Sequence, residues 1–159
     1  MEENIKNILI RKANLNDLNL VQKLNNSLFE LEFNNFDDTL KVGWSFEKEG
    51  KEYFQNMLNT EIVFIAEVQE KIVGYLAGSI CKQTSYITES FAELDNMNID
   101  DEYRRLGIGT LLIDEFKKYC KGKNVQNIKV TASAKNNRAI QFYMKNGFED
   151  YNVTLKYKI

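Results

Sequence analysis

The sequence predicts an α/β (α+β) domain in which helices cover a mixed β-sheet. Short β-branched or alternating runs are interleaved with runs whose apolar residues recur at steps of three and four. Their order is strand, two helices, three strands, helix, strand, helix and strand, a pattern that packs helices onto a sheet. At 159 residues, with 43% hydrophobic and 28% charged side chains, the chain has the size and composition of a single globular domain, residues 1–159.

The first third of the chain predicts one strand followed by two helices. Ile8–Arg11 is a short apolar strand, and Asn16 or Asp17 is placed to cap the helix that follows. The apolar residues of that helix lie on one face: Leu18, Val21, Leu24, Leu28 and Leu31. After a polar connection over 34–42, Ser45 is expected to cap a second helix, in which Gly50 is an unfavourable residue.

The remainder predicts a hairpin and then alternating helices and strands. Ile62–Val68 and Ile72–Cys81 flank a polar turn and form the hairpin, and a third strand ends at Ile99. The later elements are a helix over 107–119, a strand over 128–132, a helix over 136–145 and a closing strand over 153–158. Gly147 suits the C-terminal cap of the last helix.

Composition excludes several classes of function. The net charge is −2 and no basic run is present, so nucleic acid and anionic membrane are not expected partners. The absence of histidine excludes Ser–His triads and imidazole metal sites, and no metal is expected. Cys81 and Cys120 form no C-x-x-C pair and are expected to be buried or half-buried thiols. No signal peptide or membrane span is recognisable at the start or within the chain, so we expect a cytoplasmic protein.

The most informative segment joins a strand to a helix through glycines. It contains Arg104-Arg105-Leu106-Gly107-Ile108-Gly109-Thr110, which enters an amphipathic helix directly. Main-chain N–H groups at the positive end of a helix dipole, with glycines that let a ligand approach, suit a phosphate. An ordinary strand-to-helix turn explains the same glycines. A dinucleotide-binding oxidoreductase is disfavoured because Leu112 stands where that fingerprint has a third glycine, and a P-loop lacks its Lys.

A second segment makes the pattern specific. Asn136, Ala139, Tyr143 and Gly147-Phe148 are spaced as Asn-x-x-Ala-x-x-x-Tyr-x-x-x-Gly-Phe. With the Arg-x-x-Gly-x-Gly loop one helix and one strand earlier, the chain resembles the GNAT superfamily of acetyl-CoA-dependent N-acetyltransferases. The resemblance implies a mostly antiparallel central sheet whose middle strands splay apart, with helices on both faces. It also implies that acetyl-CoA is the co-substrate.

The resemblance assigns the acetyl-CoA contacts to three segments. The main chain of Met97, Asn98 and Ile99 would hold the pantetheine arm, and one of its N–H groups would polarise the thioester carbonyl. Residues 105–110 would cradle the pyrophosphate, with Arg104 adding charge. Asn136 would contact acetyl-CoA from the last helix.

The resemblance also implies an acid and a base. Tyr143 aligns with the family's usual general acid, which returns a proton to the leaving thiolate; a core tyrosine is the simpler interpretation. Glu93 is the expected general base, and Asp95 alternates onto the same face of its strand. Either carboxylate would equally serve as a structural or solvated residue. Thr131 occupies the position where other family members carry a glutamate.

The acceptor is expected to be a primary amine, with a small molecule favoured over a peptide or protein amine. Asp37, Asp38 and Trp44, together with Asp95, offer carboxylates and a ring for a cationic amine. A solvated acidic loop with Trp44 as a packing anchor is the competing interpretation. A non-catalytic acyl-CoA-binding sensor or scaffold of the same fold is the alternative function. Because dimers are common in the family, a homodimer is also expected.

Overall fold

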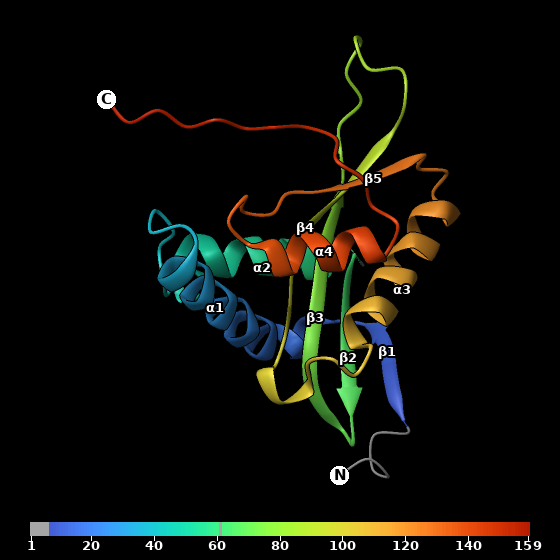
Figure 1. The fold of residues 1–159 in the computed structure, drawn as a ribbon. Coiled ribbons are helices and arrows are strands. Elements are labelled where there is room, and N and C mark those ends of the chain that lie inside the picture. Colours follow the sequence, from blue (N-terminus) through green and yellow to red (C-terminus); the bar gives the residue numbers. More distant parts are fainter. Residues whose placement is uncertain (1–6, 61) are drawn as a thin grey trace.

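The computed structural model describes residues 7–60 and 62–159, and within them a five-stranded sheet lies between two pairs of helices (Figure 1). The strands are β1 (Ile8–Lys12), β2 (Val63–Val68), β3 (Lys71–Ile80), β4 (Phe91–Ile99) and β5 (Asn127–Val130). The helices are α1 (Leu18–Asn35), α2 (Lys48–Asn59), α3 (Ile108–Gly122) and α4 (Asn137–Lys145). Neighbouring strands are antiparallel except β4 and β5, which are parallel. The predicted mixed, mostly antiparallel α/β (α+β) architecture is confirmed.

The sheet divides the core into two layers. Phe64 and Ala66 of β2 face α3, where they meet Leu112 and Phe116. The alternate β2 residues Val63 and Ile65 face α1 and α2. Because β2 is covered on both faces, residues 63–66 form a continuous apolar run, which the ion-paired Glu67 ends.

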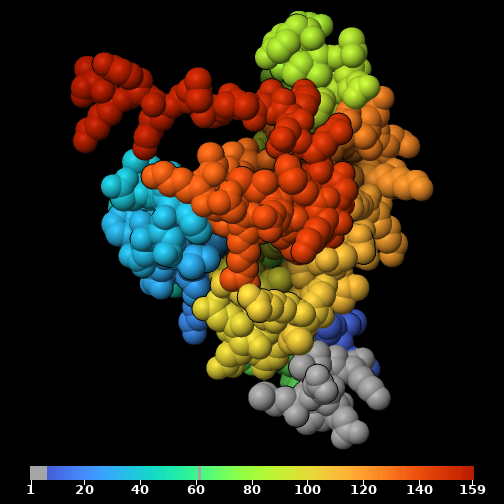
Figure 2. All heavy atoms as spheres, viewed as in Figure 1, coloured from blue at the N-terminus to red at the C-terminus, as the bar shows by residue number. Residues whose placement is uncertain are grey.

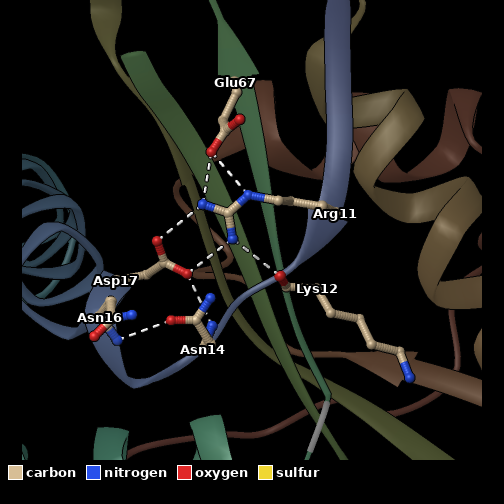
Figure 3. Close-up of polar contacts among 6 residues, drawn as sticks. All are labelled: Arg11, Lys12, Asn14, Asn16, Asp17 and Glu67. Carbon is tan, nitrogen blue, oxygen red and sulfur yellow. Dashed lines mark hydrogen bonds and ion pairs between the residues drawn. The ribbon is translucent and has the colours of Figure 1, made fainter. Parts of the chain in front are cut away.

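An ion-pair cluster fixes the passage from β1 into α1 (Figure 3). The Arg11 guanidinium contacts Asp17 at 2.9 Å and Glu67 of β2 at 2.6 Å, and it donates to the Lys12 carbonyl. Asn14 caps the turn Leu15–Asp17 by accepting from the Asn16 N–H, while Asp17 accepts from the Asn14 N–H. Asp17 occupies the N-cap position of α1 but makes no side-chain cap there, and Asn16 contributes only its main-chain N–H, so the capping side chain is Asn14 of the preceding turn and not the predicted Asn16 or Asp17.

Replacing Arg11 with Met should lower the free energy of unfolding by about 3 kcal/mol, because Asp17 is buried and would lose its counter-charge. Although burial opposes its ionisation, the Arg11 guanidinium and the main-chain N–H of Asn14 hold the pKa of Asp17 below its ordinary value. The stabilisation is therefore present above the ordinary carboxyl pKa and is lost as pH falls through the lowered one. Urea unfolding at pH 7 and at acidic pH measures both effects.

The control for Arg11 is Lys41→Met. Lys41 pairs with Glu47 at 2.7 Å, but both side chains are largely exposed. Such a pair contributes at most about 1 kcal/mol, so the variant should unfold close to the parent. Equal losses in the two variants would contradict the role given to Arg11.

The connection between α1 and α2 differs from the prediction. Ser45 does not cap α2; it lies in the 3₁₀ turn Trp44–Phe46, where its hydroxyl donates to the Gln22 carbonyl and its own carbonyl accepts from the Gln22 amide. A Cβ on Gly50 would lie 2.1 Å from the Trp44 carbonyl oxygen. Gly50 is therefore tolerated inside α2 because the chain passes against it there.

The C-terminal segment also departs from the prediction. Residues 153–158 form no strand, and the chain from 149 to 159 has no regular secondary structure. Figure 1 shows this segment running away from the helices and the sheet. The predicted closing strand is therefore wrong for the chain as it stands, because no neighbouring strand lies beside it.

The remaining observations concern the burial of the two cysteines, the length of the helices and groups of possible metal ligands. Cys120 is buried and Cys81 is partly buried, as predicted. Over residues 7–60 and 62–159, no helix is both long enough and apolar enough to span a membrane. The same residues contain no cluster of three or more acidic or cysteine side chains suited to a metal ion.

Candidate active site

The site is organised by the separation of β4 from β5. Among the described residues the two strands pair only from Phe91 opposite Asn127 to Leu94 opposite Val130. Asp95 lies at a bulge, since Leu94 and Asn96 pair with the consecutive β3 residues Gly78 and Ala77. Beyond the bulge, Met97–Ile99 remain paired with β3, and no strand of the described part of the chain lies on their other side. The predicted splay is therefore present and leaves main-chain groups for a ligand.

The loop after β4 presents the open N-terminus of α3. Arg105 and Gly107 have positive φ values of 65° and 81°, and no side chain caps the helix at Gly107. The first intrahelical bond runs from the Leu111 N–H to the Gly107 carbonyl, so the preceding N–H groups lie at the positive helix end. This geometry fits an anionic group such as a pyrophosphate.

The two glycines of the loop have different roles. Gly107 needs its positive φ, and the space beside it is open. A Cβ on Gly109 would instead lie 2.8 Å from the Phe142 ring and 3.2 Å from Ile99. Gly109 therefore lets α4 pack closely on α3, and Phe142 is a packing residue.

Arg104 is anchored to the end of β4. Its guanidinium donates to the Ile99 carbonyl at 3.0 Å and to Asn98 Oδ1 at 3.3 Å, and it pairs with Asp101 at 2.6 Å. The Asn98 amide donates to the Leu24 carbonyl of α1. These contacts border a hollow of about 560 Å³ at the carboxyl end of β4. The Arg104 charge is thus held beside the predicted binding segments.

Asn136 joins α4 to α1. Its Oδ1 accepts from the Ala139 N–H as the N-cap of α4, and its Nδ2 donates to Glu32 at 3.0 Å. Burial raises the pKa of Glu32, the bond from Asn136 opposes that change, and the charge of Asp37 adds to it. Asn136 therefore holds the two helices on either side of the splay, and its contact with acetyl-CoA stays a prediction.

Tyr143 lies on α4 between the rings of Phe142 and Phe148, at 5.4 and 5.5 Å between centroids. Burial and then the Glu32 carboxylate raise its pKa to about 12. Its hydroxyl makes no hydrogen bond within the described residues, and it is close enough to the Tyr75 hydroxyl to affect the pKa of that group. Tyr143 is therefore a protonated phenol within electrostatic reach of Glu32 and Tyr75, and its hydroxyl is free to donate.

Glu93 and Asp95 form a pair of neighbouring carboxylates just before the splay. Glu93 contacts Lys129 of β5 at 3.2 Å, and this bond raises the lysine pKa. Partial burial raises the pKa of Asp95, the Ser79 hydroxyl opposes the shift, and the Glu93 charge adds to it. The raised pKa makes Asp95 a better proton acceptor than an ordinary aspartate.

A chain of buried polar groups holds the β4 bulge in place. The Asn25 amide donates to Tyr75 Oη at 3.0 Å, and the Tyr75 hydroxyl donates to Asn96 Oδ1 at 2.6 Å. The Asn96 amide then donates to Tyr53 Oη of α2. Burial raises the pKa of Tyr53 to about 12, and the charge of Asp95 adds to this effect. This series of hydrogen bonds places the Tyr53 phenol of α2 beside Glu93 and Asp95.

The acceptor residues expected from the α1–α2 connection have mixed surroundings. The Trp44 ring stacks on Phe29 at 5.9 Å between centroids and contacts the Tyr53 ring at 5.6 Å. Trp44 is therefore next to Tyr53, which in turn is next to the carboxylate pair. Asp37 accepts from the Thr39 hydroxyl and N–H, bonds that hold its pKa below the ordinary value. Asp38 is exposed. Binding of an amine by these residues and Asp95 stays a prediction.

Sequence reasoning missed four members of the site: Glu32, Tyr75, Asn96 and Lys129. Their partners lie 21 to 104 residues away along the chain or on the neighbouring strand. Asn25 offered a signal, since it lies on the buried side of α1 where a polar residue needs a partner. The sequence did not identify that partner.

The family comparison covers most of the chain. The model of the acetyltransferase (GNAT) family matches residues 25–148. An uncharacterized N-acetyltransferase of Methanocaldococcus jannaschii is 29% identical over 152 residues, which are 94% of this chain and 64% of that protein. An N-alpha-acetyltransferase of Sulfurisphaera tokodaii is 31% identical over 101 residues, which are 59% of this chain and 60% of that protein. The chain thus spans less than two thirds of the length of these relatives.

Solved structures share the fold. The BH1408 protein of Bacillus halodurans, solved as a tetramutant, superposes with a TM-score of 0.82 at 21% identity, covering 95% of this chain and 99% of that one. An aminoglycoside acetyltransferase from an uncultured soil metagenomic sample, in complex with sisomicin, has a TM-score of 0.71 at 24% identity, covering 100% and 99%. At these identities the likeness establishes the architecture.

Proposed function

The chain belongs to the GNAT acetyltransferase family, and we propose that it is an N-acetyltransferase that transfers the acetyl group of acetyl-CoA to a primary amine. The observation that carries this proposal is the splay of β4 from β5 beside the uncapped N-terminus of α3. One feature suits an extended amide-rich arm, and the other suits a pyrophosphate.

Three groups of residues would hold acetyl-CoA. The main chain of Met97–Ile99, on the side away from β3, would bind the arm, while the N–H groups of residues 105–110 would bind the pyrophosphate, with Arg104 supplying charge nearby. Asn136 borders the same space as the N-cap of α4. When bound, acetyl-CoA supplies a thioester whose carbonyl carbon is open to attack by an amine.

The proposed reaction is direct attack within a ternary complex. The Glu93–Asp95 pair takes a proton from the acceptor ammonium, directly or through water, and frees the nitrogen lone pair. A main-chain N–H of Met97–Ile99 stabilises negative charge on the carbonyl oxygen as the N–C bond forms. Tyr143 gives its proton to the sulfur as the C–S bond breaks. The new N–C bond leaves the nitrogen with one proton more than the amide carries; this proton is lost to water, and Tyr143 is reprotonated from water.

A small cationic amine is the acceptor that the surroundings favour. Glu93 and Asp95 lie beside the Tyr53 phenol, and the Trp44 ring lies next to Tyr53. Carboxylates beside aromatic rings suit an ammonium group. Two structures of the same architecture are aminoglycoside acetyltransferases, which supports a small-molecule acceptor.

A peptide α-amine is the second candidate. The S. tokodaii relative is an N-alpha-acetyltransferase, and it matches over more than half of this chain. The carboxylate pair would serve a peptide N-terminus by the same proton transfer.

Release of free thiol from acetyl-CoA tests the proposal. Polyamines, aminoglycosides, amino acids and short peptides should be assayed in parallel, with a thermal-shift measurement of acetyl-CoA binding. We expect one acceptor class to release thiol at least tenfold faster than the amine-free control, and acetyl-CoA to raise the melting temperature. Binding without turnover on any acceptor would favour the acyl-CoA sensor, and no binding would overturn the proposal.

A further inference from the structure

A lysine of β5 is paired with one member of the Glu93–Asp95 pair. Lys129 lies opposite Glu93 where β5 and β4 run side by side, and its Nζ contacts Glu93 Oε2 at 3.2 Å. The strand residues on either side of these two pack into the α3 layer: Ala92, Leu94, Ile128 and Val130. Because side chains alternate along a strand, Lys129 and Glu93 point to the other face of the sheet, the side of α2. The ion pair is therefore held by two paired strands, close to the point where they separate.

Asp95 lacks such a partner. Its Oδ1 accepts from the Ser79 hydroxyl of β3 at 3.2 Å, and among the described residues it forms no ion pair. Burial raises the pKa of Asp95 and the Ser79 bond opposes this change, while the Glu93 charge raises the pKa and the Lys129 charge lowers it. Asp95 is thus close enough to feel both members of the ion pair without belonging to it.

The other ionisable groups around the pair are uncharged at pH 7. Burial raises the pKa of Cys81, which follows β3, and raises the pKa of Tyr53 on α2 to about 12. Tyr151 lies within electrostatic reach of Lys129, and a phenol is protonated at this pH. Beyond Tyr151 the chain projects from the body of the molecule (Figure 2), so the groups around the pair come from the sheet, α2 and this one tyrosine. Two carboxylates and one ammonium remain charged, which leaves a single negative charge for an acceptor cation.

We propose that Lys129 is a positioning residue of this site, which holds Glu93 in the ion pair and leaves Asp95 as the carboxylate that takes the proton of the acceptor ammonium. This inference rests on the proposed function. One proton moves from the ammonium nitrogen to a carboxylate oxygen of Asp95, and the amine keeps the electron pair of the broken N–H bond. The Asp95 acid returns this proton to water after acetyl transfer. Glu93 keeps its charge throughout, because a carboxylate that already binds a cation gains less from a proton.

The pH dependence of thiol release tests this role with the most active acceptor. In Lys129→Met, the charge that lowers the Asp95 pKa is gone, so the acid limb of kcat/KM should move to higher pH by at least about 0.5 unit. Lys129→Arg keeps the charge and should return the limb to within about 0.2 unit of the parent. Lys118→Met removes a lysine that pairs with Glu115 at 3.6 Å on α3, and this matched control should keep the parent profile.

The two carboxylates should also differ in the activity that each substitution removes. In the parent, Asp95→Asn should lower kcat/KM at least about threefold more than Glu93→Gln, because only the second variant keeps the proton acceptor. In the Lys129→Met background Glu93 is no longer held, and the two losses should become equal. A difference that persists without Lys129 would show that the lysine does not choose between the carboxylates, and it would overturn the proposal.

NMR of the carboxyl carbons gives a measurement that needs no acceptor. The Asp95 signal should titrate at least about 0.5 pH unit higher in Lys129→Met than in the parent. An acid limb or an Asp95 titration that does not move would overturn the role of Lys129 and leave the proposed function in place. A parent that releases no thiol with any acceptor would instead overturn the proposed function, and the assignment of the proton to Asp95 with it.

Discussion

Replacing Tyr143 with Phe is expected to lower kcat about 10²-fold while leaving acetyl-CoA affinity nearly unchanged. The substitution removes only the hydroxyl, so the packing of the ring between Phe142 and Phe148 is retained. Without the phenol, the thiolate must leave without a proton from the enzyme. Steady-state thiol release with the best acceptor measures kcat, and calorimetric titration measures acetyl-CoA binding.

The matched control is Tyr119→Phe. Tyr119 is a partly buried tyrosine of α3 that lies beside Phe64, away from the splay. The kcat of this variant should stay within about twofold of the parent, because the Tyr119 hydroxyl is far from the reacting atoms.

The pKa of Tyr143, raised to about 12 by burial and then by Glu32, adds a further check. Since the proton is retained until pH approaches that value, loss of this acid should not lower the parent kcat between pH 7 and 10. Unchanged turnover in Tyr143→Phe would remove Tyr143 as the acid.

The fold and the main binding loop could be predicted because their signals are local. Among the described residues, period-two and period-3.6 patterns located the four α-helices and the five strands but not the three 3₁₀ turns, and positive φ at Gly107 agrees with a turn that needs glycine. The role of Gly109 could not be read from its neighbours in sequence, since the Phe142 ring that fills its empty side lies on α4. A glycine motif alone does not separate ligand approach from helix packing.

The departures have one physical cause, which is that long-range partners override local preference. Ser45 has the chemistry of a helix cap, but Gln22 of α1 takes both its hydroxyl and its carbonyl group. The buried side of α1 contains Gln22 and Asn25 because Ser45 and Tyr75 pair with them. Residues 153–158 have the alternation of a strand, but a strand also needs a neighbour, and in this structure the segment pairs with none of the five described strands.

Removing both carboxylates of the Glu93–Asp95 pair should lower kcat/KM about 10²-fold at pH 7. Glu93 and Asp95 lie close enough for the Glu93 charge to add to the raised pKa of Asp95, so we expect either carboxylate to be within reach of the acceptor proton. In Glu93→Gln or Asp95→Asn alone, the remaining carboxylate can still accept the proton, and each single loss should be smaller than that of the double variant. Thiol-release kinetics on the four proteins measure this coupling directly.

The pH profile separates proton transfer from loss of acceptor binding. The active pair must be deprotonated, so the parent rate should fall as pH drops through the raised pKa of Asp95, above that of an ordinary aspartate. In the double variant this acid limb should disappear, whereas a pair that only binds the ammonium would raise KM and leave kcat unchanged. Glu115→Gln on α3, whose carboxylate pairs only loosely with Lys118 at 3.6 Å, should retain both rate and profile. If the double variant kept the parent acid limb, the base would have to lie elsewhere. Glu32 would then be the first residue to test, because its charge is the one that raises the pKa of Tyr143.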